Sequence, residues 1–381
     1  MATGRIPGTS GSPLTAKGDI FAYSTTASRL PVGSDGQTLV ANSAQTTGLG
    51  WSPLGMAGKN RVINGAMNIA QRGTTYALTN AVAYGSVDRW AFYQSGTANG
   101  IANQVASGLT GFQYAIKMGR NSGATTTGVV QGVQPFETAN SVDLQGQVVT
   151  FSFYAKAGAN FSAASNNITY AVYTGTGTDQ SAISQAAGSW TGILTPILGT
   201  QAITTTWTRY SYTGTIASTA TQVGVGMYYT PTGTAGADDN LYITGVQLEL
   251  GSVATTFSRN ATTLQGELAA CQRYYERINA VAAGAAITSN AQALTTTIVD
   301  SVLPFAATKR VTPTAIDSSG IYVYRTVVAA SATGGTVTLS PSCAPYQGVA
   351  RYTMGSATFT LGEIDIPSFS SGGYIGFSAE L

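Results

Sequence analysis

Alternation of apolar and polar residues with a period of two is the feature that most restricts the fold of this sequence. In one such run Val149, Phe151 and Phe153 fall on the same side of the chain. The runs occupy residues 148–156, 168–174, 207–215, 222–230 and 241–250. Alternation of this kind is typical of strands with one buried face, and the Gly, Thr, Asn and Asp clusters between the runs are typical of turns. The sequence therefore predicts a large all-β domain over residues 59–260, folded as a jelly-roll β-sandwich.

The surface of this domain has to be covered with few charges. Charged residues make up 9% of the chain, against about 25% in ordinary soluble domains, whereas Gly, Ser, Thr, Asn and Gln are abundant. The 20 Tyr and 12 Phe are spread along the chain, which argues against intrinsic disorder. A neutral polar surface suits a protein that works outside a cell or within a large assembly.

Several classes of function are disfavoured by what the sequence lacks. The net charge is +2 and residues 157–208 contain no Lys or Arg, so the clustered cations that nucleic acids require are missing. The chain has no His, which removes the commonest general base and metal ligand. There is no apolar run long enough to span a membrane, no secretory signal, and the two cysteines form no disulfide framework. We expect no cofactor, no metal site, no membrane insertion and synthesis in a reducing cytosol.

Other segments flank the predicted sandwich. Residues 1–58 are punctuated by Gly, Ser and Pro, which predicts an extended arm that orders on a partner, with a flexible leader as the alternative. Residues 279–381 return to short alternating runs and predict a C-terminal β-sandwich. Its candidate strands are 293–299, 321–328, 335–339, 350–354 and 357–361.

Residues 261–278 read as a helix, because a polar start is followed by helix-forming residues. The apolar positions of this segment follow the spacing of a short coiled-coil seam. They are Leu264, Leu268, Cys271, Tyr275 and Ile278. A single helix that packs on its own sandwich has the same pattern and remains the alternative.

Three passages resemble a known family. The first comprises Lys17-Gly-Asp-Ile20, Arg29-Leu-Pro-Val-Gly-Ser-Asp-Gly-Gln-Thr-Leu-Val-Ala41 and Gly48-Leu-Gly-Trp51. The second comprises Asn60-Arg-Val-Ile-Asn-Gly-Ala-Met-Asn-Ile-Ala-Gln-Arg72 and Val87-Asp-Arg-Trp90. The third comprises Val246-Gln-Leu-Glu-Leu-Gly-Ser252, Phe257-Ser-Arg259 and Glu267-Leu-Ala-Ala-Cys-Gln-Arg-Tyr-Tyr275. In this order they resemble the leader, the jelly-roll module and the following helix of bacteriophage tail-fibre and receptor-binding proteins.

The resemblance implies a homotrimeric virion protein, made in the host cytoplasm, and favours an interchain seam at residues 261–278. It implies attachment to a tail, baseplate or capsid protein through the arm, and host adhesion through residues 279–381, whose expected ligand is surface polysaccharide or lipopolysaccharide. The residues expected to dock the arm are Ile20, Phe21, Leu39, Trp51 and Leu54. The residues expected to bind glycan, by aromatic stacking and hydrogen bonding, are Tyr322, Tyr324, Arg325, Tyr346, Arg351 and Tyr352.

Two alternatives to an adhesive fibre stay open, a polysaccharide-degrading fibre enzyme and a decoration fibre without a receptor. Glycoside hydrolysis needs two suitably spaced carboxylates. Asp238 and Asp239 are adjacent but are explained by a turn before a strand, with a structural Ca²⁺ site as a minor alternative. Glu363 and Asp365 share a face of an expected strand whose Ile364 and Ile366 point inward. We therefore expect binding and not catalysis.

Overall fold

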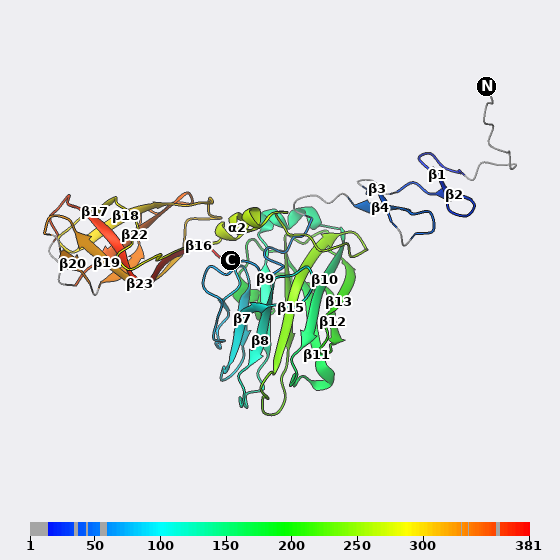
Figure 1. Ribbon diagram of the computed structural model, residues 1–381, viewed down its shortest axis with the longest axis horizontal. Coiled ribbons are helices and arrows are strands. Elements are labelled where there is room, and N and C mark those ends of the chain that lie inside the picture. Colours follow the sequence, from blue (N-terminus) through cyan, green and yellow to red (C-terminus); the bar gives the residue numbers. More distant parts are fainter. Residues whose placement is uncertain are drawn as a thin grey trace, which may run out of the picture. The chain divides into compact units, whose positions relative to one another are not determined.

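The computed structural model describes residues 14–33, 37–42, 45–53, 59–328, 330–333, 335–355 and 359–381. The chain divides into two compact units, Met1–Met56 and Ala57–Leu381 (Figure 1). Strands account for nearly all of the regular structure, which confirms the predicted all-β class. None of the helices in the described residues combines the length and apolar character that crossing a membrane requires.

The N-terminal unit contains two β-hairpins. Strand β1 (Ile20–Tyr23) pairs with β2 (Ala27–Leu30), and β3 (Gln37–Ala41) pairs with β4 (Leu49–Pro53). The Asp19 carboxylate accepts a hydrogen bond from the Ala16 N–H at 2.7 Å and pairs with Arg29 at 2.7 Å. These segments of the predicted arm therefore contain local β-hairpins, which need only local hydrogen bonds and no core of their own.

The jelly roll is built of two antiparallel sheets. The first sheet has the strand order β13-β10-β15-β8-β7, and the second has the order β12-β11-β14-β9-β6-β5. Strands of the first sheet are β7 (Gly100–Ala106), β8 (Tyr114–Arg120), β10 (Val148–Ala157), β13 (Thr208–Thr215) and β15 (Asn240–Leu250). Strands of the second are β5 (Ala83–Tyr84), β6 (Ala91–Gln94), β9 (Val130–Pro135), β11 (Asn167–Gly175), β12 (Leu194–Ala202) and β14 (Gln222–Tyr229). All five strands predicted from alternation in this region are present.

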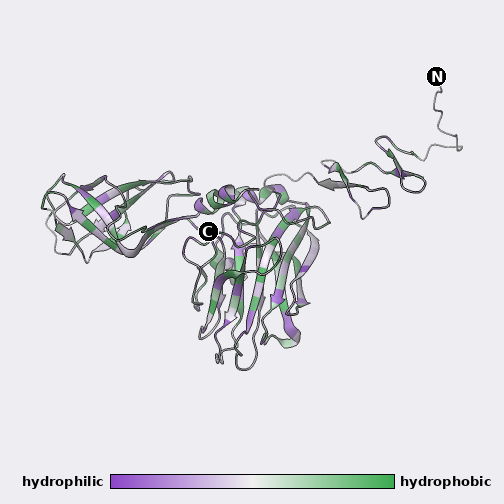
Figure 2. Cartoon of the chain, viewed as in Figure 1, coloured by the Kyte–Doolittle hydropathy of each residue, from purple (hydrophilic) through white to green (hydrophobic). Residues whose placement is uncertain are grey.

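The main core lies between these sheets. Phe151 and Phe153 of β10 are fully buried, as are Val225 and Met227 of β14. Because side chains alternate along a strand, the intervening residues point away from the core, and Figure 2 shows the resulting change of hydropathy along the strands. The sandwich also carries four short helices. They are η1 (Thr138–Asn140), η2 (Val142–Leu144), η3 (Ala164–Asn166) and α1 (Ala182–Ala186).

Helix α2 (Leu264–Gln272) follows the jelly roll. The Thr263 hydroxyl caps it by accepting a hydrogen bond from the Gly266 N–H at 3.1 Å. Strand β16 (Tyr275–Asn279) comes directly after the helix and pairs with β23 (Ile364–Ser378). The predicted helix over 261–278 is therefore wrong beyond residue 272, because pairing with a distant strand overrides the local helix propensity.

The C-terminal domain is a β-sandwich held together by the long strand β23. Its sheet order is β20-β19-β23-β17-β18-β22-β21, with β16 added to β23. The other strands are β17 (Ala291–Ala293), β18 (Ile298–Pro304), β19 (Ala315–Arg325), β20 (Ala330–Ala332), β21 (Thr336–Leu339) and β22 (Gln347–Thr353). The strand predicted at 293–299 is a hairpin of β17 and β18. Of the strand predicted at 357–361, residues 357 and 358 lie outside the described residues and 359–361 are not strand.

Candidate functional site

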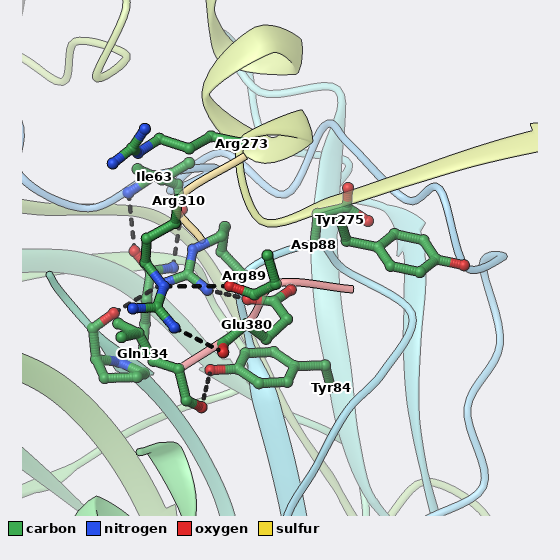
Figure 3. Close-up of polar contacts among 12 residues, drawn as sticks. Ile63, Tyr84, Asp88, Arg89, Gln134, Arg273, Tyr275, Arg310 and Glu380 are labelled. Atoms are coloured by element: carbon green, nitrogen blue, oxygen red, sulfur yellow. Dashed lines mark hydrogen bonds and ion pairs between the residues drawn. The ribbon is translucent and has the colours of Figure 1, made fainter. Parts of the chain in front are cut away.

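Residues of the second and third resembling passages meet in one buried polar junction (Figure 3). The Asn64 N–H donates to the Glu267 carboxylate, and the Asn64 side-chain amide donates to the Asp88 main-chain oxygen at 3.0 Å. The Gln71 amide donates to the Asp88 carboxylate at 2.5 Å and to the Tyr275 main-chain oxygen at 2.7 Å. Burial raises the pKa of Asp88 to about 6. This set of contacts joins the jelly roll to α2 and β16, so these motif residues have a structural role.

Arg89 is the centre of a second part of this junction. Its guanidinium pairs with Glu380, donates to the Pro135 main-chain oxygen at 2.8 Å and lies 3.5 Å from the centroid of the Tyr274 ring. The Tyr84 hydroxyl donates to the Leu381 main-chain oxygen at 3.1 Å. Residues after β23 are thereby attached to the jelly roll of the same chain.

The residues of the predicted trimer seam are divided between helix α2 and strand β16 and do not lie on one continuous helix. Cys271 is fully buried and packs with Ile63, Ile69 and Tyr274 of its own chain. Tyr275 and Ile278 lie on β16, where pairing with β23 replaces the helical spacing. Leu268 packs at the edge of the Cys271 cluster and Leu264 is exposed. Cys271 is therefore already packed within its own chain, and the change from helix to strand after residue 272 interrupts the expected seam spacing. Both observations favour the alternative of a helix packed on its own sandwich.

The predicted glycan-binding residues of the C-terminal domain do not all face solvent. Tyr352 is wholly buried and its hydroxyl lies 3.1 Å from the Ser301 hydroxyl, so it belongs to the core. Arg351 forms a two-pronged ion pair with Asp300. Arg325 pairs with Glu363 at 3.7 Å. Tyr322 and Tyr324 lie on β19 and Tyr346 precedes β22, and Tyr346 is 65% exposed.

The two acidic pairs are held by neighbouring side chains. Asp239 forms a fully buried ion pair with Arg120 at 2.7 Å, and Asp238 accepts a hydrogen bond from the Tyr242 hydroxyl at 2.8 Å. In β23 it is Asp365 that is buried and Ile364 that is exposed, so the expected inward direction of Ile364 is wrong. Among the described residues no group of three or more His, Cys, Asp or Glu side chains is placed to hold a metal ion.

The arm residues predicted for docking belong to the two hairpins. Phe21 is exposed and Ile20 is half-buried on β1. Leu39 and Trp51 are cross-strand partners in the second hairpin, and the Trp51 indole donates to the Pro31 main-chain oxygen at 2.6 Å. Leu54 lies outside the described residues.

A groove on the outer face of the six-stranded sheet is a candidate binding feature of the jelly roll. Tyr93 of β6, Gln131 of β9 and Tyr228 of β14 are paired in register, so their side chains form one row across three strands. Tyr173 of β11 and Gln185 of α1 also line the groove. The groove has a volume of about 420 Å³, within the range of small-molecule binding sites. We call this feature the tyrosine groove.

The floor of the tyrosine groove is buried and its walls are half-exposed. Gln131, Tyr173 and Gln185 are buried, whereas Tyr93 and Tyr228 are half-exposed. Burial, together with the neighbouring Tyr228, raises the pKa of Tyr173 to about 12, and a hydrogen bond with Gln131 opposes the rise. The Gln185 amide nitrogen donates to the Val225 main-chain oxygen at 3.0 Å, while its side-chain oxygen has no partner among the described residues. A buried acceptor without a donor is unusual in a folded protein.

Two glycines of β14 make room for these groups. A Cβ at Gly226 would stand 3.0 Å from the Tyr173 ring, and a Cβ at Gly224 would stand 2.7 Å from the Gln185 amide. Small residues therefore let the sheet accept large groups on its outer face. The run 222–230 predicts strand β14, but nothing in its alternation reveals that Tyr228 aligns with residues nearly 100 positions earlier, because register is set by tertiary pairing.

The tyrosine groove has the chemistry of a site for a polar, uncharged ligand with apolar faces. Tyrosine rings offer flat apolar surfaces with a hydroxyl at the edge, and glutamine amides both donate and accept hydrogen bonds. Of the described residues that line the groove, none is charged. Such a lining fits a sugar ring, which presents C–H groups on its faces and hydroxyls around its rim.

Comparisons with known proteins show similarity only at the level of solved structures. No family model and no curated protein matches the sequence. Similar structures include the enzymatically active domain of bacteriophage CBA120 tailspike protein 4, at 14% identity and a TM-score of 0.32, over 51% of this chain and 22% of that chain. They also include a CBM4 structure, at 18% identity and a TM-score of 0.30, over 50% of this chain and 100% of that chain. TmCBM61 in complex with β-1,4-galactotriose matches at 11% identity and a TM-score of 0.28, over 50% of this chain and 99% of that chain. With TM-scores this low, no function is transferred from these proteins.

Proposed function

We propose that this chain is a glycan-binding adhesive protein of a bacteriophage particle and that the tyrosine groove of its jelly roll is the binding site. The observation that carries the site is the in-register row Tyr93–Gln131–Tyr228 beside the buried Tyr173. The role in a virion is supported by the resemblance of residues 17 to about 278 to tail-fibre proteins. The proposed site therefore lies in the jelly roll, whereas the sequence predicted glycan binding by the C-terminal domain.

The proposed activity is binding without cleavage. Glycoside hydrolysis commonly uses two carboxyl groups flanking the scissile bond, and the described residues that line the tyrosine groove include no Asp or Glu. Attachment through the N-terminal unit and assembly into a trimer, on a surface other than the predicted seam, remain parts of the proposal. Several copies on one particle would bind cells tightly even where each groove binds weakly.

A screen of host-surface polysaccharides with the full chain and two variants tests the site. Tyr228→Ala removes one wall of the groove, and we expect the affinity for any bound glycan to fall about tenfold to a hundredfold. Tyr346→Ala is the matched control, because this exposed tyrosine lies in the C-terminal domain. Loss of binding in Tyr346→Ala with full binding in Tyr228→Ala would place the site in the C-terminal domain instead.

A further inference from the structure

A second hollow adjoins the tyrosine groove at Ser95. This hollow, which we call the threonine cavity, has a volume of about 540 Å³ and lies between the β6–β7 and β8–β9 loops. It is lined by Ser95, Gly96, Thr97, Asn99, Thr125, Thr126, Thr127 and Gly128. Ser95 and Val129 continue the outer-face alternation of β6 and β9 beyond Tyr93 and Gln131, and the Ser95 N–H donates to the Val129 main-chain oxygen at 3.0 Å. Ser95 lines both hollows.

The threonine cavity offers many hydrogen-bonding groups that the protein does not use itself. The hydroxyls of Thr97, Thr125 and Thr127 form no hydrogen bond with any other described residue, and Thr97, Thr125 and Thr127 are exposed. Each hydroxyl can donate one hydrogen bond and accept others. As in the tyrosine groove, none of the described residues that line this cavity is charged.

The loops around the threonine cavity are held in place from behind. Arg120 is fully buried and pairs with Asp239, and it donates to the main-chain oxygens of Thr126 at 2.7 Å and Ala124 at 3.3 Å. A Cβ at Gly128 would stand 1.8 Å from the Ser95 main-chain oxygen, so the two loops touch through main chain at this point. A rim that is fixed before the ligand arrives loses less entropy on binding.

We propose that the tyrosine groove and the threonine cavity form one trough that binds an uncharged polysaccharide as an extended chain. Sugar rings lie on the tyrosines in the groove, and hydroxyls further along the same chain bond to the threonines of the loops. This inference rests on the proposed function and adds to it the class of ligand and a second region of contact. It predicts that affinity rises with the length of the oligosaccharide and does not depend on salt, because no ion pair forms.

Isothermal titration of the full chain with neutral gluco-, manno- and galacto-oligosaccharides, from mono- to hexasaccharide, tests this trough. The double variant Thr97→Val and Thr127→Val keeps the shape of the side chains and removes two hydroxyls. We expect it to bind a hexasaccharide about tenfold more weakly than the wild type, with disaccharide affinity unchanged. Tyr228→Ala should weaken both ligands, and an oligogalacturonate of equal length should bind no better than its neutral counterpart.

The outcomes separate this inference from the proposed function. Unchanged hexasaccharide affinity in the double valine variant, with binding lost in Tyr228→Ala, would overturn the trough and leave the tyrosine groove standing. Affinity that does not rise with chain length, or that is higher for the oligogalacturonate, would also overturn the trough. Absence of binding to every oligosaccharide and to every polysaccharide in the screen would overturn both. Circular dichroism and melting of each variant confirm that it is folded.

Discussion

The Arg89 guanidinium lies against the Tyr274 ring, 3.5 Å from its centroid, and pairs with Glu380 at the other end of the chain's second unit. Arg89 is 1% exposed, so its charge depends on these contacts. Removing one partner of a buried ion pair leaves the other charge uncompensated. Arg89, in the segment Val87-Asp-Arg-Trp90 that resembles tail-fibre proteins, therefore stabilises the buried polar junction.

Glu380→Gln should lower the free energy of unfolding by about 3–5 kcal/mol. The remaining hydrogen bond from Arg89 to the Pro135 main-chain oxygen does not neutralise the charge. Urea denaturation followed by fluorescence measures the change. Asp143→Asn is the control, because Asp143 pairs with Arg61 but is 52% exposed, and exposed pairs contribute about 0–1 kcal/mol. Equal effects of the two substitutions would show that Glu380 does not neutralise a buried charge.

Cys271 should be unreactive in the native protein. Burial raises the pKa of the Cys271 thiol, and the side chain is fully enclosed by its own chain. Cys343 is half-buried and should react first with a thiol reagent. Cys271→Ser should cost about 1–3 kcal/mol, because the hydroxyl would be buried in an apolar cluster. Rapid labelling of Cys271, or a disulfide between chains under mild oxidation, would contradict this expectation and support the interchain seam.

Asp365 should make stability depend on pH. Burial and the neighbouring Glu363 raise the pKa of Asp365 to about 6. The Thr326 main chain and the Arg325 charge lower this pKa but do not cancel the rise. Between pH 4 and pH 6, approximately, the folded state then holds a proton that the unfolded state has released, so the contribution of Asp365 to stability falls as pH rises through this range. Asp365→Asn imitates the protonated acid and should stabilise the protein at pH 7.5 by about 1–2 kcal/mol.

The test for Asp365 is how the difference in stability between Asp365→Asn and the wild type changes with pH. The gain of the Asp365→Asn variant over the wild type should shrink as the pH falls through about 6 and vanish near pH 4. Melting temperatures of both proteins across this range measure it. Asp143→Asn, which replaces a 52% exposed carboxylate, again serves as the control. A variant that is less stable than the wild type at pH 7.5 would mean that the charged form of Asp365 is favoured in the fold.

Sequence alone could predict the strands of this protein better than their partners. The alternation of β10 follows from its own residues, since Phe151 and Phe153 must share one face. The strand conformation of Tyr275 and Ile278 does not follow from their own residues, because β16 pairs with β23, about 100 residues later in the chain. The same limit applies to the site. Tyr93, Gln131 and Tyr228 each look like ordinary strand residues, and only the register of three strands brings them into one row.

The N-terminal unit should be dispensable for the fold of the second unit. Met1–Met56 and Ala57–Leu381 are separate compact units, so deletion of residues 1–56 should change the free energy of unfolding of the remainder by less than about 0.5 kcal/mol. The same deletion should abolish incorporation into particles if this unit attaches the protein to the virion. Particles that still carry the truncated protein would show that attachment resides in the second unit.

Arg120 should couple the stability of the jelly roll to the binding of long glycans. The Arg120 guanidinium pairs with Asp239 and donates hydrogen bonds to main-chain oxygens of the loops, among them those of Thr126 at 2.7 Å and Gly233 at 2.7 Å. Lysine keeps the charge but cannot reproduce this planar set of donors. Arg120→Lys should therefore destabilise the protein by about 1–3 kcal/mol and weaken hexasaccharide binding while disaccharide binding is kept. Arg351→Lys is the matched control, because Arg351 makes a similar two-pronged pair with Asp300 in the C-terminal domain and should affect stability only. If both lysine variants bound the hexasaccharide as the wild type does, the loops around the threonine cavity would not need Arg120 to be fixed for binding.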